Sequence, residues 1–332
     1  MTPIDHAARV TDVTTEVGDA TLVVTNLTDL RWLTGFETSN GWAVVRHGEL
    51  FVGTDGRYGD KARAETEGTG ATVIVEQQAG ALAARRSELA GDVAPDRTII
   101  ERRRRVKDAA EIERIEAAAA CADAALAEVE PMLAEEPTEL EVRAELEYRM
   151  VRHGADDRSY PTIVATGPDH GARPHHGAVR RRIVEGDTVI IDVGALVDGY
   201  HSDMTRSWVV GDASPEQRAT YQLVATAQRA GLEAVGPGAS SRAVDAACRD
   251  LFEQAGCLDD YVHGTGHGVG LDIHEPPFHN QSSDLTLEPG MVVTVEPGLY
   301  RGGFGGFRIE DLVLVTASGH RVLTHSPKRE LN

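Results

Sequence analysis

The 332-residue sequence has few cysteines and no long apolar run. Its three cysteines, Cys121, Cys248 and Cys257, are too few and too scattered for a disulfide framework, so we expect free thiols. No segment approaches the roughly 20 apolar residues that cross a bilayer. The first residues also lack the apolar stretch of a secretory signal. These absences predict a cytoplasmic globular protein without a membrane partner.

Lysine is also scarce, and the chain is strongly acidic. The formal net charge is −20 at pH 7, and only three of the 33 basic residues are lysines. This balance argues against a nucleic-acid partner, because phosphate contacts need clustered cations. One basic run, Arg102 to Arg105 with Lys107, precedes an acidic stretch, and we interpret it as a solvated linker. Because an acidic, lysine-poor surface stays hydrated in high salt, we also hypothesise a halophilic host.

Residues 1–105 are predicted to form a small α/β domain, because β-rich runs alternate there with polar and helical segments. The predicted strands are Thr21–Thr25, Trp42–Val45, Glu49–Val52, Thr72–Val75 and Thr98–Glu101. One helix is predicted over Ala79–Ala90.

Residues 106–332 are predicted to form a second domain in which two helices followed by strands occur twice. Helix starts are indicated by capping signals at Asp108, Thr138 and Ser214. The predicted helices are Ala109–Glu130, Thr138–His153, Ser214–Val235 and Ser241–Ala255. The predicted strands are Thr162–Thr166, Thr188–Gly194, Ser202–Val210, Val292–Glu296 and Phe307–Val315. The repeated order predicts an α+β domain with two similar halves about a pseudo-twofold axis.

Two aspartates lie in a predicted hairpin. Asp192 ends an apolar β-branched run, and Asp203 follows the tight-turn dipeptide Asp198-Gly199. A turn centred between Val197 and Asp198 would place Asp192 opposite Asp203 on one face. Two facing carboxylates on apolar strands need a proton, an arginine or a cation between them.

A second motif combines histidine with glycine. His263-Gly264-Thr265-Gly266-His267-Gly268 is followed by His274. The glycines let other groups approach the backbone closely, and no Lys-Ser/Thr pair ends the run as in a phosphate loop. Three histidines within twelve residues favour a functional site. The remaining histidines are interpreted as packed or solvated: His6, His47, His153, His170, His201, His279, His320 and His325.

A third motif supplies two glutamates. Glu296 and Glu310 each follow a β-branched or apolar run on either side of a glycine-rich loop. Glutamate is disfavoured in the middle of a strand, so its presence twice indicates function. Asp311 alternates to the opposite face and is left out.

These residues together predict a metal centre. Four carboxylates and one imidazole suit Mn²⁺, Co²⁺, Zn²⁺ or Fe²⁺. Four carboxylates balance two divalent ions, whereas a single ion would leave an uncompensated net negative charge in a buried site. Two such ions bind and activate a shared hydroxide. The predicted ligands are Asp192, Asp203, His267, Glu296 and Glu310.

With these motifs the chain resembles the pita-bread metallopeptidases, specifically the Xaa-Pro dipeptidase and aminopeptidase P branch with its creatinase-type N-terminal domain. The resemblance covers nearly the whole chain. Besides the ligand motifs it rests on Asn26–Phe36, Asp55–Tyr58, Lys107–Ile112, Ser159–Val164 and Arg173–His176. It implies hydrolysis of a peptide with proline at the second position by a metal-bridging hydroxide. It also implies a homodimer and two divalent ions, with Mn²⁺ as the first expectation.

The resemblance also implies roles for individual residues. Asp203 and Glu310 would bridge the ions, Asp192 would chelate one, and His267 and Glu296 would hold the other. Glu296 would also pass a proton from the bridging water towards the proline nitrogen. The scissile carbonyl and the oxyanion would be held by His263 and His274, with His175 as the equivalent histidine of the first half, and Arg308 would orient substrate or carboxylates.

Two assignments stay open within this resemblance. His176 makes the histidine of the first half ambiguous by one position, and His175 is favoured because it lies 11 residues before Gly186. Tyr300, Phe304 and Phe307 are candidates either for an apolar wall against the prolyl ring or for core packing.

Several alternative functions stay open as well. The short N-terminal domain favours a dipeptidase over an aminopeptidase P. A methionine aminopeptidase would ordinarily lack that domain, and a creatinase-type hydrolase would lack the metal ligands. A lyase on the same fold would keep the ligands, whereas a non-enzymatic binding protein would typically lose them and gain basic tails.

Overall fold

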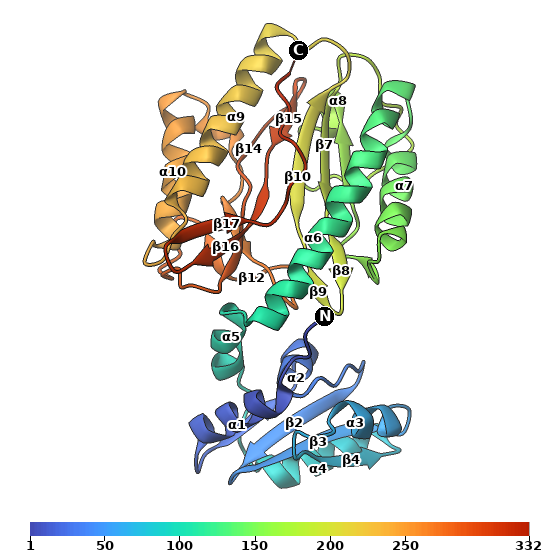
Figure 1. The fold of residues 1–332 in the computed structure, drawn as a ribbon, viewed down its shortest axis with the longest axis vertical. Helices are drawn as coiled ribbons and strands as arrows, with labels where there is room; N and C mark the ends of the chain where they lie inside the picture. The colour runs from blue at the N-terminus through green and yellow to red at the C-terminus, as the bar shows by residue number, and fades with distance from the viewer. Residues whose placement is uncertain (332) are drawn as a thin grey trace. The chain divides into compact units, whose positions relative to one another are not determined.

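The computed structural model describes residues 1–331 and contains two compact units (Figure 1). One unit comprises Thr2–Arg104, and the other begins at Arg105. Within residues 1–331, no helix combines the length and apolar character that a membrane span requires. All three cysteines are free thiols, as the sequence predicts.

The N-terminal unit is a four-stranded sheet in the order β1-β2-β3-β4 with helices around it. The first three strands are antiparallel, and β4 runs parallel to β3 after a helical crossover. Trp42 and Val44 of the sheet pack against Leu82 of α4. The elements are α1 (His6–Val17), β1 (Thr21–Val24), α2 (Leu27–Thr34), β2 (Gly41–Arg46), β3 (Glu49–Asp55), α3 (Gly59–Glu65), β4 (Thr72–Glu76), α4 (Ala79–Ala90) and α5 (Thr98–Arg105). The predicted α/β organisation is confirmed.

Two predictions are wrong at the end of this unit. Thr98–Glu101 is the start of α5 and not a strand, because the Asp96 carboxylate accepts hydrogen bonds from Thr98 N and Oγ1 and starts a helix there. The basic run is not a solvated linker either. The Arg104 guanidinium is buried and donates to the fully buried Asp29 carboxylate, so part of the run is a structural ion pair.

The second unit consists of two layers of long helices with antiparallel sheets between them (Figure 1). Its first half has α6 (Ala109–Val129), η1 (Glu130–Glu135), α7 (Glu139–Arg152), β5 (Asp157–Arg158), β6 (Ile163–Thr166), α8 (Gly167–His170), β7 (Thr188–Val193), β8 (Ala195–Val197), β9 (Tyr200–His201) and β10 (Met204–Val209). The second half has α9 (Pro215–Ala234), α10 (Ser241–Gln254), η2 (Leu258–Asp260), β11 (Gly266–Gly268), β12 (Glu275–His279), β13 (Val292–Val295), β14 (Gly298–Arg301), β15 (Gly305–Arg308), β16 (Asp311–Thr316) and β17 (Gly319–Val322).

Each half packs its helices on its own sheet. In the first half α6 and α7 cover a sheet of order β10-β7-β6 through an aliphatic core that includes Leu126, Leu146 and Ile191. In the second half α9 and α10 contribute to two further cores beside the sheet β12-β11-β13-β16-β17. Capping boxes at Asp108, Thr138 and Ser214 start α6, α7 and α9, as predicted.

The hairpin that carries the two aspartates has a different register from the predicted one. Asp198 and Gly199 both have positive φ (47° and 79°), which makes them the two central residues of the turn. Asp192 is therefore opposite Thr205 and not opposite Asp203. Because the shift is two residues, Asp192 and Asp203 stay on the same face of the strands.

The predicted strand Phe307–Val315 is also wrong, since it is two strands. β15 pairs with β14, whereas β16 pairs with β13 and β17 in another sheet. The chain changes sheets at Ile309 and Glu310. This break turns Glu310 towards the first half of the unit, where its backbone N–H donates to Thr205 O at 3.1 Å.

Candidate metal centre

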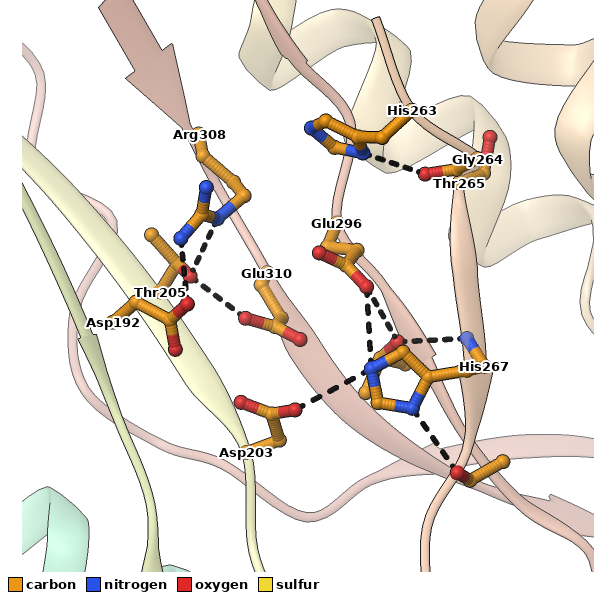
Figure 2. A network of polar contacts seen from close by, with 12 residues as sticks. Asp192, Asp203, Thr205, His263, Gly264, Thr265, His267, Glu296, Arg308 and Glu310 are labelled. Atoms are coloured by element: carbon orange, nitrogen blue, oxygen red, sulfur yellow. Dashed lines mark hydrogen bonds and ion pairs between the residues drawn. The ribbon is translucent and has the colours of Figure 1, made fainter. Parts of the chain in front are cut away.

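The predicted ligands come from both halves of the second unit and meet between its sheets. Asp192 is the next-to-last residue of β7, and Asp203 immediately precedes β10. His267 lies in β11, and Glu296 follows β13. Glu310 stands at the break between β15 and β16. Asp203, His267 and Glu310 each offer a ligand atom, and these atoms lie within 4.8 Å of one another. Figure 2 shows the three side chains facing one another, with Glu296 beside them.

The two aspartates share one hydrogen-bond donor. The Tyr160 hydroxyl, from the segment before β6, donates to Oδ1 of both Asp192 and Asp203. The other Asp192 oxygen, Oδ2, accepts from Arg308 Nη2 at 2.6 Å. Burial and the charges of Asp192, Asp203 and Glu310 raise the pKa of Tyr160 well above its usual value, so the hydroxyl remains a donor. The sequence analysis quoted Tyr160 only within a family motif and assigned it no role.

The His267 ring is oriented by the backbone. Its Nδ1 lies 3.0 Å from Gly268 O, which assigns the proton to Nδ1 and leaves a lone pair on Nε2. Nε2 faces Asp203 Oδ2 at 3.5 Å and Glu296 Oε1 at 3.4 Å (Figure 2). Burial lowers the pKa of His267, which favours the neutral ring. A neutral lone pair directed at carboxylate oxygens is the arrangement that a shared cation stabilises.

Glu310 is the most enclosed of the carboxylates. Its Oε2 accepts from Thr205 Oγ1 at 2.7 Å, but its Oε1 is buried and has no hydrogen-bond partner within residues 1–331. Burial, with the charges of Asp203, Glu296 and Asp192, raises the pKa of Glu310 well above its ordinary value. Burial and the charges of Asp192 and Glu296 likewise raise the pKa of Asp203. The donor set therefore fits divalent cations, which would compensate the repulsion and coordinate the unpaired oxygen.

Arg308 links the ligands to the residues behind them. The buried guanidinium donates to Asp192, to Tyr300 Oη at 2.8 Å, to Thr205 Oγ1 at 2.9 Å and to Pro174 O at 3.1 Å. Tyr300 Oη in turn lies 2.9 Å from His263 Nε2. These contacts are consistent with the predicted orienting role of Arg308. His263 lines the same cavity as the ligands while its Nε2 contacts Tyr300 Oη.

A cavity of about 490 Å³ opens beside the ligands, and this volume is within the range of small-ligand sites. His175 and His274 line it, and both are exposed and make no hydrogen bond to another residue of the described chain. His176 does not line the cavity, which agrees with the choice of His175. The structure also places Phe278, Asn280 and His279 along the cavity. His279 is buried, in agreement with its interpretation as a packed histidine, whereas Phe278 and Asn280 had no predicted role.

The three aromatic residues considered for the prolyl wall lie elsewhere. Phe307 is fully buried in the core beside α9, and Phe304 packs against that core. Tyr300 is buried in the Arg308 network. None of the three lines the cavity, so their role is packing. Asp311 faces away from the ligands towards Arg206 Nη2, at 2.9 Å, as the predicted alternation requires.

Comparison with known families agrees with this arrangement. The family model described as metallopeptidase family M24 matches residues 113–317. The chain belongs to metallopeptidase family M24. A second model, the creatinase/prolidase N-terminal domain, matches residues 7–135 of this M24 chain.

Individual relatives support the same placement. The M24 chain is 42% identical over 233 residues to a Xaa-Pro dipeptidase of Pyrococcus furiosus, covering 70% of this chain and 66% of that relative. Among solved structures it resembles a Xaa-Pro dipeptidase from Bacillus anthracis, with a TM-score of 0.89, 33% identity, and coverage of 98% of this chain and 99% of that one. An X-Pro aminopeptidase from Thermotoga maritima matches with a TM-score of 0.86, 28% identity, and coverage of 98% and 99%. The fold is therefore the pita-bread fold with its N-terminal domain.

Proposed function

We propose that this chain is a Xaa-Pro dipeptidase that binds two divalent metal ions. The observation that carries the proposal is the convergence of Asp203, His267 and Glu310 within 4.8 Å beside a cavity of about 490 Å³. The names of the relatives, two Xaa-Pro dipeptidases and an X-Pro aminopeptidase, support the substrate class. Residues 106–332 would be the catalytic domain, and residues 1–105 the creatinase-like N-terminal domain.

The five predicted ligands would hold the ions as the family resemblance implies. The residues that would hold them are Asp192, Asp203, His267, Glu296 and Glu310. Support comes from the unpaired Glu310 Oε1 and from the His267 Nε2 that faces two carboxylates. When bound, divalent ions supply a Lewis acid that polarises the scissile carbonyl and lowers the pKa of the attacking water.

The remaining chemistry belongs to side chains around the cavity. The Glu296 side chain is 18% exposed, compared with 6% for Asp203 and 9% for His267, so it reaches the open side of the cluster. It would take a proton from the attacking water and deliver it to the proline nitrogen as the carbon–nitrogen bond breaks. His263 and His274 would hold the carbonyl and the developing oxyanion, with His175 as the equivalent histidine of the first half, and all three line the cavity.

The bond before proline suits such a site. It is a tertiary amide without an N–H, so a protease that reads that N–H recognises it poorly. Here the cavity offers apolar surface from Pro161, Ile163 and Phe278, of which Phe278 is 41% exposed. These residues replace the aromatic wall that the sequence analysis considered.

The finer properties form part of the same proposal. Mn²⁺ is the expected ion, with Co²⁺, Zn²⁺ and Fe²⁺ as alternatives. We propose a cytoplasmic homodimer that recycles proline from peptides. The net charge of −20 and the three lysines support a halophilic host, for which activity would rise between dilute and molar salt.

The test is hydrolysis of Ala-Pro, Ala-Pro-Ala and Ala-Ala by metal-stripped protein refilled with Mn²⁺, Co²⁺ or Zn²⁺, in dilute and in molar salt. We expect cleavage of Ala-Pro alone. His274→Gln should lower this activity, whereas the control His320→Gln, outside the cavity, should not. Release of alanine from the tripeptide would instead indicate an aminopeptidase P. Metal binding without cleavage of any proline peptide would reject the peptidase and favour a lyase or a binding protein.

A further inference from the structure

A second group of metal-ligating side chains lies in the first half of the catalytic unit. Glu139, His170 and His176 each offer a ligand atom, and these atoms lie within 4.8 Å of one another. Glu139 is the first residue of α7, His170 is the last residue of α8, and His176 follows six residues later. None of the three lines the catalytic cavity or contacts the five predicted ligands.

The Glu139 carboxylate is held in a fixed orientation. The residue is fully buried, and its Oε1 accepts from Thr166 N at 3.0 Å and from Thr166 Oγ1 at 2.7 Å. Its Oε2 accepts from Val179 N at 3.2 Å. His170 Nδ1 lies 2.9 Å from Oε1 and 3.1 Å from Oε2. Such outer contacts are those that orient a metal-binding carboxylate.

His176 supplies the independent observation. Its ring stacks on His170 with centroids 3.9 Å apart and planes inclined by 38°. Its Nε2 is shielded from solvent and has no hydrogen-bond partner among residues 1–331. A buried nitrogen without a hydrogen-bond partner is destabilising, so its presence beside a carboxylate and a second imidazole requires an explanation.

The charge around the group favours a cation. Arg173, which acts electrostatically on His176, is exposed to solvent. Arg181 donates to Thr166 Oγ1 at 2.7 Å and also forms a bidentate pair with Asp187 at 2.7 and 2.8 Å. Its charge is therefore compensated. Two neutral imidazoles and one carboxylate leave a net charge of −1 for an incoming ion.

We propose that Glu139, His170 and His176 form a mononuclear site for a divalent cation of the Zn²⁺ class, separate from the dinuclear centre. Two imidazoles and one carboxylate, with water in the fourth position, are a set that Zn²⁺ accepts. Tetrahedral bonds of that set place ligand atoms about 3.4 Å apart, so the 2.9–3.1 Å between His170 Nδ1 and Glu139 must open slightly. The ion replaces any proton on His170 Nδ1, which moves to the other ring nitrogen or to solvent.

Occupation of this site would connect α7 to the segment that carries part of the catalytic cavity. Pro174 and His175 lie between His170 and His176 in the sequence and line that cavity. An ion bound by both flanking histidines would fix the two ends of the segment against the start of α7. We therefore expect Zn²⁺ to stabilise this segment as well as to bind.

The experiment counts bound Zn²⁺ per chain by equilibrium dialysis and elemental analysis of metal-stripped protein. It compares the wild type with His170→Asn/His176→Asn. The same comparison is repeated in a background without the dinuclear centre. There the double variant Asp203→Asn/Glu310→Gln is compared with the variant that also carries His170→Asn and His176→Asn. In both backgrounds we expect the histidine pair to account for one Zn²⁺ per chain and for a Zn²⁺-dependent rise in melting temperature.

The control is His153→Asn, because His153 also lies beside a glutamate, with Nε2 2.8 Å from Glu128 Oε1, but outside the group. It should leave the Zn²⁺ count unchanged, and circular dichroism should show that all variants fold. An unchanged count after both histidines are replaced overturns the proposal. This readout does not depend on hydrolysis, so the site and the proposed function can fail separately.

Discussion

Glu310→Gln should stabilise the metal-stripped protein while abolishing its response to metal. The substitution keeps an oxygen that can accept from Thr205 Oγ1 and removes one of the charges that meet in the centre. It also replaces the unpaired oxygen by an amide that can donate to a neighbouring carboxylate. In the metal-free wild type, by contrast, the Glu310 carboxylate must either stay charged in a buried position or take up a proton.

Two independent estimates give the size of this effect. Protonating a carboxyl with an ordinary pKa of 4.5 costs about 1.4 kcal/mol for each pH unit above that pKa, or about 3.4 kcal/mol at pH 7. Because Glu310 can always avoid burying its charge in this way, the charge cannot destabilise the folded chain by more than this amount. The ligand atoms of Asp203 and Glu310 lie within 4.8 Å of each other, so their repulsion at an effective dielectric constant of about 20 is at least about 3.5 kcal/mol. Glu310→Gln should therefore stabilise the metal-free protein by up to about 3 kcal/mol, or about 6–10 °C for a domain of this size.

The effect has a defined dependence on pH. Because the pKa of Glu310 is raised in the folded chain, the penalty is present above pH 4.5 and vanishes below it. At pH 5 the variant should gain only about 0.7 kcal/mol. Metal at 100 times its Kd should stabilise the wild type by about 2.7 kcal/mol and leave the variant nearly unchanged.

The assay is calorimetric melting with a chelator and then with Mn²⁺. Asp311→Asn is the matched control, because this buried carboxylate is paired with Arg206 and Lys328, and its neutralisation should destabilise by about 3–5 kcal/mol. If Glu310→Gln melts below the wild type in chelator at pH 7, the repulsion argument is refuted.

Three further substitutions test residues outside the predicted ligand set. Arg308→Lys should lower metal affinity, measured by dialysis, or kcat, measured in steady-state assays, by about 10–100-fold, because lysine cannot reproduce the planar set of hydrogen bonds. Unchanged metal affinity and kcat would contradict the positioning role of Arg308. Lys107→Met should destabilise by about 3–5 kcal/mol in denaturant titration, because it removes the ammonium partner that lies 2.5 Å from the buried Glu275 carboxylate. Adding Glu275→Gln should restore part of the loss, and no restoration would contradict this explanation. Gly53→Ala should destabilise the N-terminal unit by about 1–3 kcal/mol, because the new Cβ would lie 2.1 Å from the Trp42 ring; retention of wild-type stability would show that the ring can move aside.

Predictions from the sequence succeeded where local signals were sufficient. The caps at Asp108, Thr138 and Ser214 defined three helix starts, because each side chain bonds the backbone of its own first turn. The sequence-based predictions failed where residues far away in the chain determine the local secondary structure or the burial of a charge. The β-branched residues at the start of α5 suggested a strand, but the Asp96 carboxylate accepts from Thr98 N and a helix starts there. The basic run suggested a solvated linker, but Arg104 pairs with the buried Asp29 carboxylate.

The candidate site shows the same division. Motif spacing selected five residues whose chemistry suits divalent metals, and the two-residue hairpin shift left both aspartates on the chosen face. The break at Ile309 and Glu310 was not visible, because a continuous apolar pattern does not reveal a change of sheet. Tyr160 was overlooked because its role depends on two carboxylates from another hairpin.

The sequence by itself determined the chemistry available to this protein: four carboxylates and an imidazole in recognisable motifs, an acidic chain, and helices with their own caps. The tertiary structure alone decided which groups meet. It placed three histidines along the cavity, with His263 also in contact with Tyr300: His175, His263 and His274. It placed His176 beside His170 and Glu139. The reason is physical, because ligand spacing and the burial of a charge depend on segments far apart in the chain, which only folding brings within a few ångströms.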